Sequence, residues 1–263
     1  MRRRLDAELV RRGLARSRDH ARDLIESGSV RVQGTESTKV GRQVEESVSI
    51  TVRNPDESTW VSRGAHKLQG ALRAFPDLDV RGRKALDAGA STGGFTQVLL
   101  AEGVREVLAV DVGYGQLAWE LRTDPRVHVR ERCNVRNLVA ADLPYAPDLI
   151  VADLSFISLR TVIGPLIEIA AAQCDFLLMV KPQFEVGREA VGQGVVTDPA
   201  LHASAVRGVI DACQGLSLRG VAASVLPGPK GNIEYFVWLS RGIDVDACDV
   251  ETSIAMAVAG RPA

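Results

Sequence analysis

Short apolar runs alternate with segments of helical spacing between residues 84 and 240, and no other feature of the sequence constrains the fold as strongly. Runs such as LIVAD (149–153) and LLMVK (177–181) are too short for helices and are typical of strands buried on both faces. Segments such as GFTQVLLAEG and PALHASAVRGVIDACQ lie between such runs and place apolar residues at helical intervals. The sequence therefore predicts an α/β fold with a mostly parallel, doubly wound sheet. Ligands of such sheets bind beyond the carboxyl ends of the strands.

The first fifty residues predict a separate, smaller domain. LDAELVRRGLA (5–15) and RDHARDLIESG (18–28) have helical spacing, whereas SVRVQG and ESVSITV alternate as strands do. We expect Ser17 to cap the second helix and Gly28 to end it. Because NPDES (54–58) is turn-forming, we predict a small α+β domain at residues 1–53, a linker at 54–61 and a larger domain at 62–263.

The charge is distributed unevenly along the chain. Residues 1–73 hold 15 Lys and Arg against 10 Asp and Glu, whereas the remainder holds 17 against 23. A basic N-terminal domain on an acidic body suggests that this domain meets a polyanion, although a solvated helical face also explains an arginine cluster. The candidate polyanion contacts on or near the two predicted helices, which become RNA contacts under the resemblance given below, are Arg3, Arg11, Arg12, Arg16, Arg18 and Arg22.

The composition is that of a globular protein, with 46% hydrophobic and 25% charged residues. The basic N-terminus is not followed by an apolar run, so we expect no signal peptide. The apolar stretch 162–180 is interrupted by Pro165, Glu168 and Asp175, which argues against a membrane-spanning helix. The four cysteines are widely spaced, which indicates free thiols in the cytoplasm and no metal site.

The segment DAGASTGGFT (87–96) joins the first predicted strand of the sheet to its helix. Its glycines follow the spacing G-x-x-x-G-G, which is neither the dinucleotide fingerprint nor a P-loop, but they let a ligand approach the backbone. Asp111 ends the second strand, where an acid can hold ribose hydroxyls, although a tight turn beside a solvated Asp111 is the plainer interpretation. The combination resembles the S-adenosylmethionine site of Rossmann-like methyltransferases. The resemblance implies cofactor contacts from Asp87, Gly89, Ala90, Ser91, Gly93, Gly94, Phe95, Asp111, Asn134 and Asp153.

Four further ionisable residues attract attention by their positions. Asp153 closes LIVAD, Lys181 closes LLMVK, and Glu234 opens IEYFVW after a turn. Lys67 lies in a helix-compatible segment, SRGAHKLQGAL. Each has an ordinary explanation alone, namely a strand-capping Asp, a Lys reaching solvent, or an edge-strand Glu.

Together these four residues match, in order, the K-D-K-E set of RNA 2′-O-methyltransferases of the FtsJ type. WVSRGAHKL, DAGASTGGFT, VADLSFISL, VKPQFE and GNIEYF extend the resemblance to the TlyA family, from the first helix to Trp238. The N-terminal pattern LxxxLVxRGLARSRxxAxxLIxxGxVxVxG resembles the αL RNA-binding domain first described in ribosomal protein S-four. The implied fold is a Rossmann-like S-adenosylmethionine-dependent methyltransferase sheet with a small N-terminal α+β RNA-binding domain.

The resemblance also implies an activity, which is 2′-O-methylation of cytidine in ribosomal RNA, with ribosomal RNA or ribosomal subunits as partners and no membrane. It implies targets in both subunits when short terminal extensions are present. This chain has a tail at residues 244–260 that suggests a final helix.

A ribose hydroxyl is a poor nucleophile until a base removes its proton. A lysine serves as that base only when it is desolvated or lies near another cation. We therefore expect Lys181 to be the base and Asp153 to position it, with Lys67 and Glu234 orienting the ribose. Placement of the reacting atoms would supply much of the acceleration.

Residues that flank this set have weaker functional interpretations. Phe156 and Phe184 are candidates to stack on a flipped base, and core packing explains them equally well. Arg63 and His66 are candidate phosphate contacts. Glu185 lies four residues past Lys181. Its two candidate roles are a local salt bridge, which is favoured, and a contribution to the shape of the site.

Three other protein classes compete with this interpretation. A pseudouridine synthase can also carry an αL domain, but the glycine loop argues against its β-rich body. The TlyA family has also been labelled haemolysin, which would need an amphipathic or spanning segment that the sequence does not provide. A non-catalytic RNA-binding protein is disfavoured because all four residues of the charged set are present.

Overall fold

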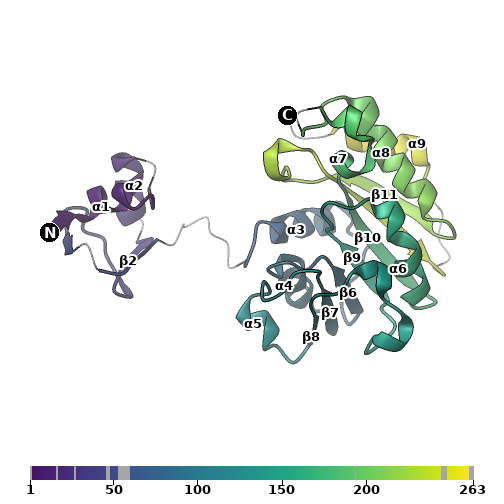
Figure 1. Ribbon diagram of the computed structural model, residues 1–263, viewed down its shortest axis with the longest axis horizontal. Helices are drawn as coiled ribbons and strands as arrows, with labels where there is room; N and C mark the ends of the chain where they lie inside the picture. Colours follow the sequence, from purple (N-terminus) through teal and green to yellow (C-terminus); the bar gives the residue numbers. More distant parts are fainter. Residues whose placement is uncertain are drawn as a thin grey trace. The chain divides into compact units, whose positions relative to one another are not determined.

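The computed structural model describes residues 2–15, 17–26, 28–45, 48–52, 60–192, 194–243 and 248–260. The chain divides into two compact units, Met1–Thr59 and Trp60–Ala263, and each has its own hydrophobic core (Figure 1). Arg16 and most of the predicted linker, residues 54–59, lie outside the described residues.

The N-terminal unit contains the two predicted helices, α1 (Leu5–Arg11) and α2 (Arg18–Glu26). Leu5, Leu9 and Ile25 from these helices are fully buried against each other and the strands. As predicted, the Ser17 hydroxyl caps α2 by accepting a hydrogen bond from the His20 amide (3.1 Å). The strands are β1 (Arg2–Arg4), β2 (Val30–Val32), β3 (Thr35–Glu36), β4 (Gln43–Glu45) and β5 (Ile50–Val52).

The strands of this unit form two small sheets, β3-β2-β5 and the pair β1-β4, all antiparallel. The predicted strands in SVRVQG and ESVSITV correspond to β2 and β5. The sequence did not reveal β1, β3 and β4, because β1 (RRR) and β3 (TE) contain no apolar residue and β4 (QVE) contains only one.

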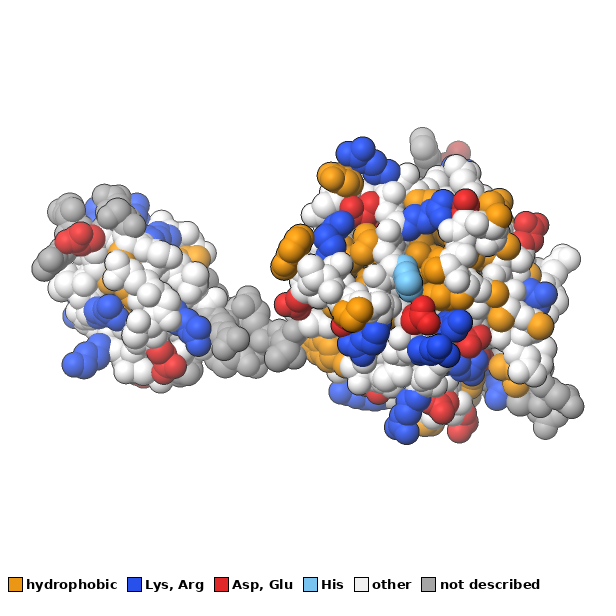
Figure 2. Space-filling view, turned by 90° about the horizontal axis from the view of Figure 1, so that it is seen from below, with side chains coloured by type: hydrophobic (Ala, Val, Ile, Leu, Met, Phe, Trp, Pro, Cys, Tyr) orange, Lys and Arg blue, Asp and Glu red, His pale blue; other side chains and the backbone are white. Residues whose placement is uncertain are grey.

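The candidate RNA-binding arginines of this unit have different surroundings. Arg3, Arg18 and Arg22 are exposed, and Figure 2 shows Lys and Arg side chains on several parts of the visible face of the unit. Arg11 and Arg12 instead bind a buried carboxylate, that of Glu8, through guanidinium contacts of 2.6–2.8 Å. Arg12 also donates to the carbonyl of Val48 (2.7 Å), which ties α1 to the segment before β5.

Seven strands of the larger unit form one sheet in the order β11-β12-β10-β9-β6-β7-β8. All neighbouring pairs are parallel except those of β12, which is antiparallel to β10 and β11. This confirms the predicted mostly parallel, doubly wound sheet. The strands are β6 (Lys84–Ala88), β7 (Glu106–Val110), β8 (Val127–Arg130), β9 (Leu149–Ala152), β10 (Cys174–Val180), β11 (Ser217–Ala223) and β12 (Tyr235–Arg241).

Helices cover both faces of this sheet (Figure 1). One face packs against α3 (Gly64–Ala74), α4 (Gly94–Ala101) and α5 (Trp119–Arg122), which contribute Leu68, Val98 and Leu121 to one core cluster. The other face packs against α6 (Ile163–Ile169), α8 (Pro199–Ala212) and α9 (Val250–Ala259). The short helix α7 (Pro182–Glu185) follows β10 directly.

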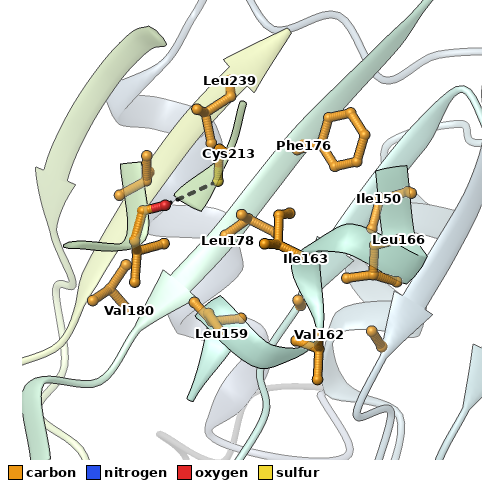
Figure 3. Packing of buried hydrophobic residues seen from close by; sticks show 14 of the residues in the cluster. Ile150, Leu159, Val162, Ile163, Leu166, Phe176, Leu178, Val180, Cys213 and Leu239 are labelled. Atoms are coloured by element: carbon orange, nitrogen blue, oxygen red, sulfur yellow. Dashed lines mark hydrogen bonds between the residues drawn. The ribbon is translucent and has the colours of Figure 1, made fainter. Parts of the chain in front are cut away.

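Successive residues of the central strands serve the two cores in turn. In β10, Phe176, Leu178 and Val180 enter the cluster under α6 and α8, whereas Leu177 and Met179 enter the other. Figure 3 shows the first three beside residues of α6. Every residue of β10 is buried, which explains why Phe176–Val180 form a continuous apolar run instead of an alternating one.

Two predicted helices are shorter than expected. The segment GQLAWELR (115–122) is helical only from Trp119, because Gly115 adopts a left-handed backbone (φ +70°) and Ala118 is extended. The segment 159–172 is divided into a 3₁₀ turn, Leu159–Thr161, and α6, which ends where Ala170 becomes extended. In both segments the helix is shortened by the backbone conformation of individual residues, which the spacing of apolar residues does not reveal.

Acid should weaken the N-terminal unit through Glu8. The hydrogen bonds from Arg11 and Arg12 lower the pKa of Glu8 from 4.5 to about 2. A carboxyl with a lowered pKa stabilises the folded state above its unfolded pKa, and that stability is lost as the pH falls toward about 2. The protection factors of the α1 amides in the full chain, which correct measured exchange rates for intrinsic exchange at each pH, should therefore fall over this interval, and less so in Glu8→Gln. The exposed Glu36→Gln is the matched control, and equal acid sensitivity of all three proteins would contradict the assignment.

Candidate active site

The strand order places the candidate site at one edge of the larger unit's sheet. The chain leaves β6 toward β7 and β8 on one side and later returns to β9 and β10 on the other, so the direction reverses between β6 and β9. In such sheets the crevice at this reversal is where ligands bind. Asp111, Asp153 and Lys181 follow the carboxyl ends of β7, β9 and β10. Glu234 reaches the same edge because it precedes β12, which is antiparallel to its neighbour β10.

The glycine loop after β6 lets the backbone of the neighbouring strand approach closely. Gly89 has φ +89°, and a Cβ atom there would lie 2.7 Å from the carbonyl oxygen of Asp153. A Cβ atom on Gly94 would lie 2.2 Å from the Ser62 hydroxyl and 2.9 Å from the amide nitrogen of Ala65. These two glycines therefore bring the segment after β9 and the start of α3 against the loop.

A first cavity of about 560 Å³ opens beside this loop, in the size range of small-molecule sites. Asp111 lines it, and its carboxylate accepts hydrogen bonds from the amides of Ser91 (2.8 Å) and Gly113 (2.6 Å). The wall combines polar groups with apolar side chains, a mixture that suits a nucleoside. Its lining includes Gly89, Ser91, Asp111, Asn134, Asp153, Ser155, Phe156 and Ile157.

Asp87 occupies a different environment from the other predicted cofactor residues. Its side chain is fully buried at the end of β6 and accepts a hydrogen bond from the Thr96 hydroxyl on α4 (2.7 Å). Burial raises the pKa of Asp87 to about 7, and the nearby charge of Asp153 acts in the same direction. Its observed contact is thus with α4, beneath the loop.

A second cavity of about 400 Å³ adjoins the first and shares Gly89, Ser91, Asp153 and Ser155 with it. It is the cavity in which the two candidate lysines meet. Its lining includes Arg63, Lys67, Ala90, Gly94, Phe95, Asp153, Ser155 and Lys181. A ligand in the first cavity and a ligand in the second would therefore contact the same four residues from opposite sides.

The four ionisable residues of the K-D-K-E set form two ion pairs. The Lys181 ammonium lies 2.5 Å from Asp153 Oδ1 and donates a hydrogen bond to the Ser155 hydroxyl (2.9 Å). The Lys67 ammonium pairs with Glu234 Oε2. Both lysines are only 7% exposed and Glu234 is fully buried, so each charge depends on its partner for stabilisation.

Glu234 has one carboxylate oxygen without a hydrogen-bond partner among the described residues. Oε2 binds Lys67, whereas Oε1 is buried and has no hydrogen-bond partner in the described part of the chain. A buried acceptor without a partner is costly, and a ligand hydroxyl would relieve that cost. This observation is consistent with a hydroxyl-bearing acceptor near Glu234.

A third cavity, of about 330 Å³, lies beside the second and shares Ser155 and Lys181 with it. Phe156 and Phe184 line it with their ring centroids 5.3 Å apart. Phe156 is 91% exposed and has a left-handed backbone (φ +64°), which is costly for a bulky residue and is often found at functional sites. Core packing is therefore excluded as the role of Phe156.

The structure brings together most, but not all, of the predicted residues. Phe95 and Ala90 line the second cavity and Asn134 lines the first, whereas the partly buried His66 lines none of the three. Ser155 was not among the predicted residues, although it lines all three cavities. The signals in the sequence were its position two residues after Asp153 and its place in the segment VADLSFISL.

Two further features of the described residues bear on metal and membrane binding. No cluster of three or more His, Cys, Asp or Glu side chains there has the arrangement of a metal site. No helix among them has the length and apolar character required to cross a bilayer. On the face shown in Figure 2, the larger unit mixes basic, acidic and apolar side chains.

The sheet order, the glycine loop and the adjoining cavities define the larger unit as a Rossmann-like methyltransferase domain. The chain belongs to the FtsJ-like methyltransferase family, whose pattern matches residues 60–241, and within it to the TlyA family. Residues 3–50 match the S4 domain, as the N-terminal pattern predicted.

Full-length relatives support this placement. The chain is 52% identical over 264 residues to the 16S/23S rRNA (cytidine-2′-O)-methyltransferase TlyA of Mycobacterium tuberculosis, covering 98% of each chain. It is 42% identical to YqxC of Bacillus subtilis, covering 90% of this chain and 85% of the relative. A solved structure from Streptococcus thermophilus, named as a haemolysin, has a TM-score of 0.74 and 35% identity, covering 98% of this chain and 94% of that one.

Asp87 should make the stability of the larger unit depend on pH. A carboxyl whose pKa is raised from 3.8 to about 7 favours the folded state most below its unfolded pKa, and this contribution is lost as the pH rises to about 7. We expect the free energy of unfolding to decrease over this interval by up to about 4 kcal/mol. All three tryptophans, Trp60, Trp119 and Trp238, lie in this unit, so their fluorescence reports its unfolding in urea.

Asp87→Asn should remove most of this pH dependence, because the amide stays neutral and its oxygen can still accept from Thr96. The exposed Asp77→Asn provides the control and should behave as the wild type. A pH dependence that persists unchanged in Asp87→Asn would show that another group is responsible.

Proposed function

We propose that this protein transfers the methyl group of S-adenosylmethionine to the 2′-oxygen of cytidine in ribosomal RNA. The single observation that carries the proposal is the contact between Lys181 and Asp153, because Asp153 lines both of two adjoining cavities and Lys181 lines the second. The first cavity suits the methyl donor and the second suits a ribose.

The first cavity is the proposed S-adenosylmethionine site. Asp111, at the end of β7, would hold the ribose hydroxyls of the cofactor, and Asn134 would contact its adenine end. The backbone around Gly89 would approach the methionine part of the cofactor. When bound, S-adenosylmethionine supplies an electrophilic methyl group.

The second cavity is the proposed site of the acceptor ribose. Lys181 would accept the proton of the 2′-hydroxyl, and Asp153 and Ser155 hold its amine at the common wall of the two cavities. Lys67, which lines the second cavity, and its partner Glu234, which lines the adjoining third cavity, would orient the ribose. Fixing both reactants across one wall lowers the barrier by proximity and orientation.

The third cavity is the proposed site of the target base. A nucleotide must leave its stacked position for its ribose to enter the second cavity fully. The exposed Phe156 ring and the neighbouring Phe184 offer it a stacking surface. Stacking on an aromatic ring replaces the contacts that the base loses when it unstacks.

The N-terminal unit is the proposed RNA-docking domain. Its exposed basic residues Arg3, Arg18 and Arg22 are suited to phosphates, and Arg63 beside the second cavity would add a contact near the reaction. Arg11 and Arg12 are proposed as weaker contributors, because Glu8 already engages them. Ribosomal RNA in one or both subunits would place the protein in the cytoplasm.

Membrane lysis, the activity implied by the haemolysin name of some relatives, is not the favoured function. The methyltransferase match covers residues 60–241, and this segment contains all four ionisable residues of the proposed site. A mapping of 2′-O-methyl groups in ribosomal RNA from cells with and without the protein tests the proposal. Cytidine marks that disappear with the protein, and return on complementation, are expected, whereas an unchanged set of marks would refute it.

Replacement of Lys181 by alanine should abolish methyl transfer. Removal of the proposed base leaves the hydroxyl protonated, whereas the first cavity, which Lys181 does not line, is unchanged. Transfer of labelled methyl groups to ribosomal RNA should be lost, and calorimetry should still detect S-adenosylmethionine binding. Lys84→Ala, at the opposite end of the parallel strands, is the control. Near-normal transfer by Lys181→Ala would disprove its role as the base.

Replacement of Phe156 by alanine should reduce kcat/KM for RNA roughly 5- to 150-fold, the range expected when one base loses about 1–3 kcal/mol of stacking. Phe156→Tyr should retain most activity because it preserves the ring. The exposed Met256→Ala, on α9, controls for loss of a surface apolar group and should leave the rate unchanged. Equal kcat/KM values for Phe156→Ala and the wild type would exclude a stacking role.

A further inference from the structure

Glu185 makes far more contacts than a local salt bridge requires. Its side chain is only 2% exposed, and both of its oxygens accept hydrogen bonds. Oε1 accepts from the Leu159 amide (2.7 Å), and Oε2 accepts from the Ser158 hydroxyl (2.5 Å). Arg160 approaches Oε2 to 3.3 Å and also donates to the Glu185 carbonyl oxygen (2.7 Å).

These contacts join two segments that follow neighbouring strands. Residues 153–158 follow β9 and end in the 3₁₀ turn that starts at Leu159, whereas residues 181–185 follow β10 and form α7. At one end the segments are connected by Lys181, which contacts Asp153 and Ser155. At the other end they are connected by Glu185. The residues between the two connections include the strained Phe156.

A carboxylate is buried at a considerable free-energy cost unless donors satisfy it. Here the donors all come from the turn at residues 158–160, so the network stabilises one relative position of the two segments. Because α7 is a single short helix that begins just after Lys181, displacement of its last residue would displace its first. The geometry at Lys181 therefore depends on Glu185, although Glu185 lines neither the first nor the second cavity.

We propose that Glu185 is a positioning residue for methyl transfer, which holds the segment 153–158 so that Lys181 keeps its contacts with Asp153 and Ser155. This inference rests on the proposed function and deepens it. Glu185 acts through Lys181 and through the placement of Phe156, without touching substrate or cofactor.

The test compares Glu185→Ala and Glu185→Gln with the wild type in single-turnover methylation of ribosomal RNA. Alanine leaves the Leu159 amide unpaired, and we expect a loss of rate of roughly 10- to 100-fold, the size of effect produced by small misplacements of catalytic groups. The affinities for S-adenosylmethionine and for RNA should fall less than the rate, because binding is shared among many lining residues, whereas proton removal depends on the position of Lys181. Glutamine can still accept from Leu159 and donate to Ser158, so it should restore most of the rate.

Several outcomes would overturn the proposal. An unchanged rate in Glu185→Ala would do so, as would equal defects in the alanine and glutamine variants. A parallel loss of rate and cofactor binding would indicate general unfolding instead of positioning. Glu168→Ala removes an exposed carboxylate from α6 and should match the wild type. If the wild type itself does not methylate RNA, the proposed function fails and not this inference.

A double-mutant cycle that combines Glu185→Ala with Ser155→Ala tests whether Glu185 influences the rate through the contact between Lys181 and Ser155. If Glu185 acts through the Lys181–Ser155 contact, the two substitutions should cost less together than the product of their separate fold-changes. Multiplicative fold-changes would show that Glu185 acts independently of Ser155 and would refute the proposed path.

Discussion

The contact between Lys181 and Asp153 is the interaction on which the site depends. It forms because β9 and β10 are adjacent and parallel, so the residues that follow them emerge at the same edge. Pro182 starts α7 immediately after Lys181, which prevents the strand from continuing and leaves the ammonium at that edge. The lysine is almost fully buried, and a buried cation requires a partner, so the pair and the local fold stabilise each other.

Several carboxylates near this edge are buried, and each is used differently. Asp87 lies beneath the loop, where burial raises its pKa to about 7. Glu234 pairs with the charge of Lys67, and Glu185 holds the two segments beside Lys181 together. Buried carboxylates normally lower stability unless they are paired or protonated. These carboxylates gather at one edge of the sheet. Their burial is consistent with a site that lowers the stability of the fold and holds its charges in a defined arrangement.

Much of the fold could be predicted from sequence, because buried parallel strands and their helices carry strong apolar patterns. The strands ending at Asp153 and Lys181 were found in this way, and the order of the K-D-K-E set indicated that its members meet. Apolar patterns gave no sign of the left-handed backbone at Phe156 or of the early end of α6, since both depend on individual dihedral angles. Of the two roles predicted for Glu185, the sequence favoured the local salt bridge, because the donors Ser158, Leu159 and Arg160 lie more than twenty positions earlier in the chain.

Ser155 lines all three cavities, and this shared position has a thermodynamic consequence. A ligand that orders the segment around Ser155 in one cavity lowers the cost of ordering it for ligands in the other two. Binding of the methyl donor and binding of the flipped nucleotide would then be coupled, each strengthening the other by the same factor. Such reciprocity would favour the complex in which both reactants are present over either partial complex.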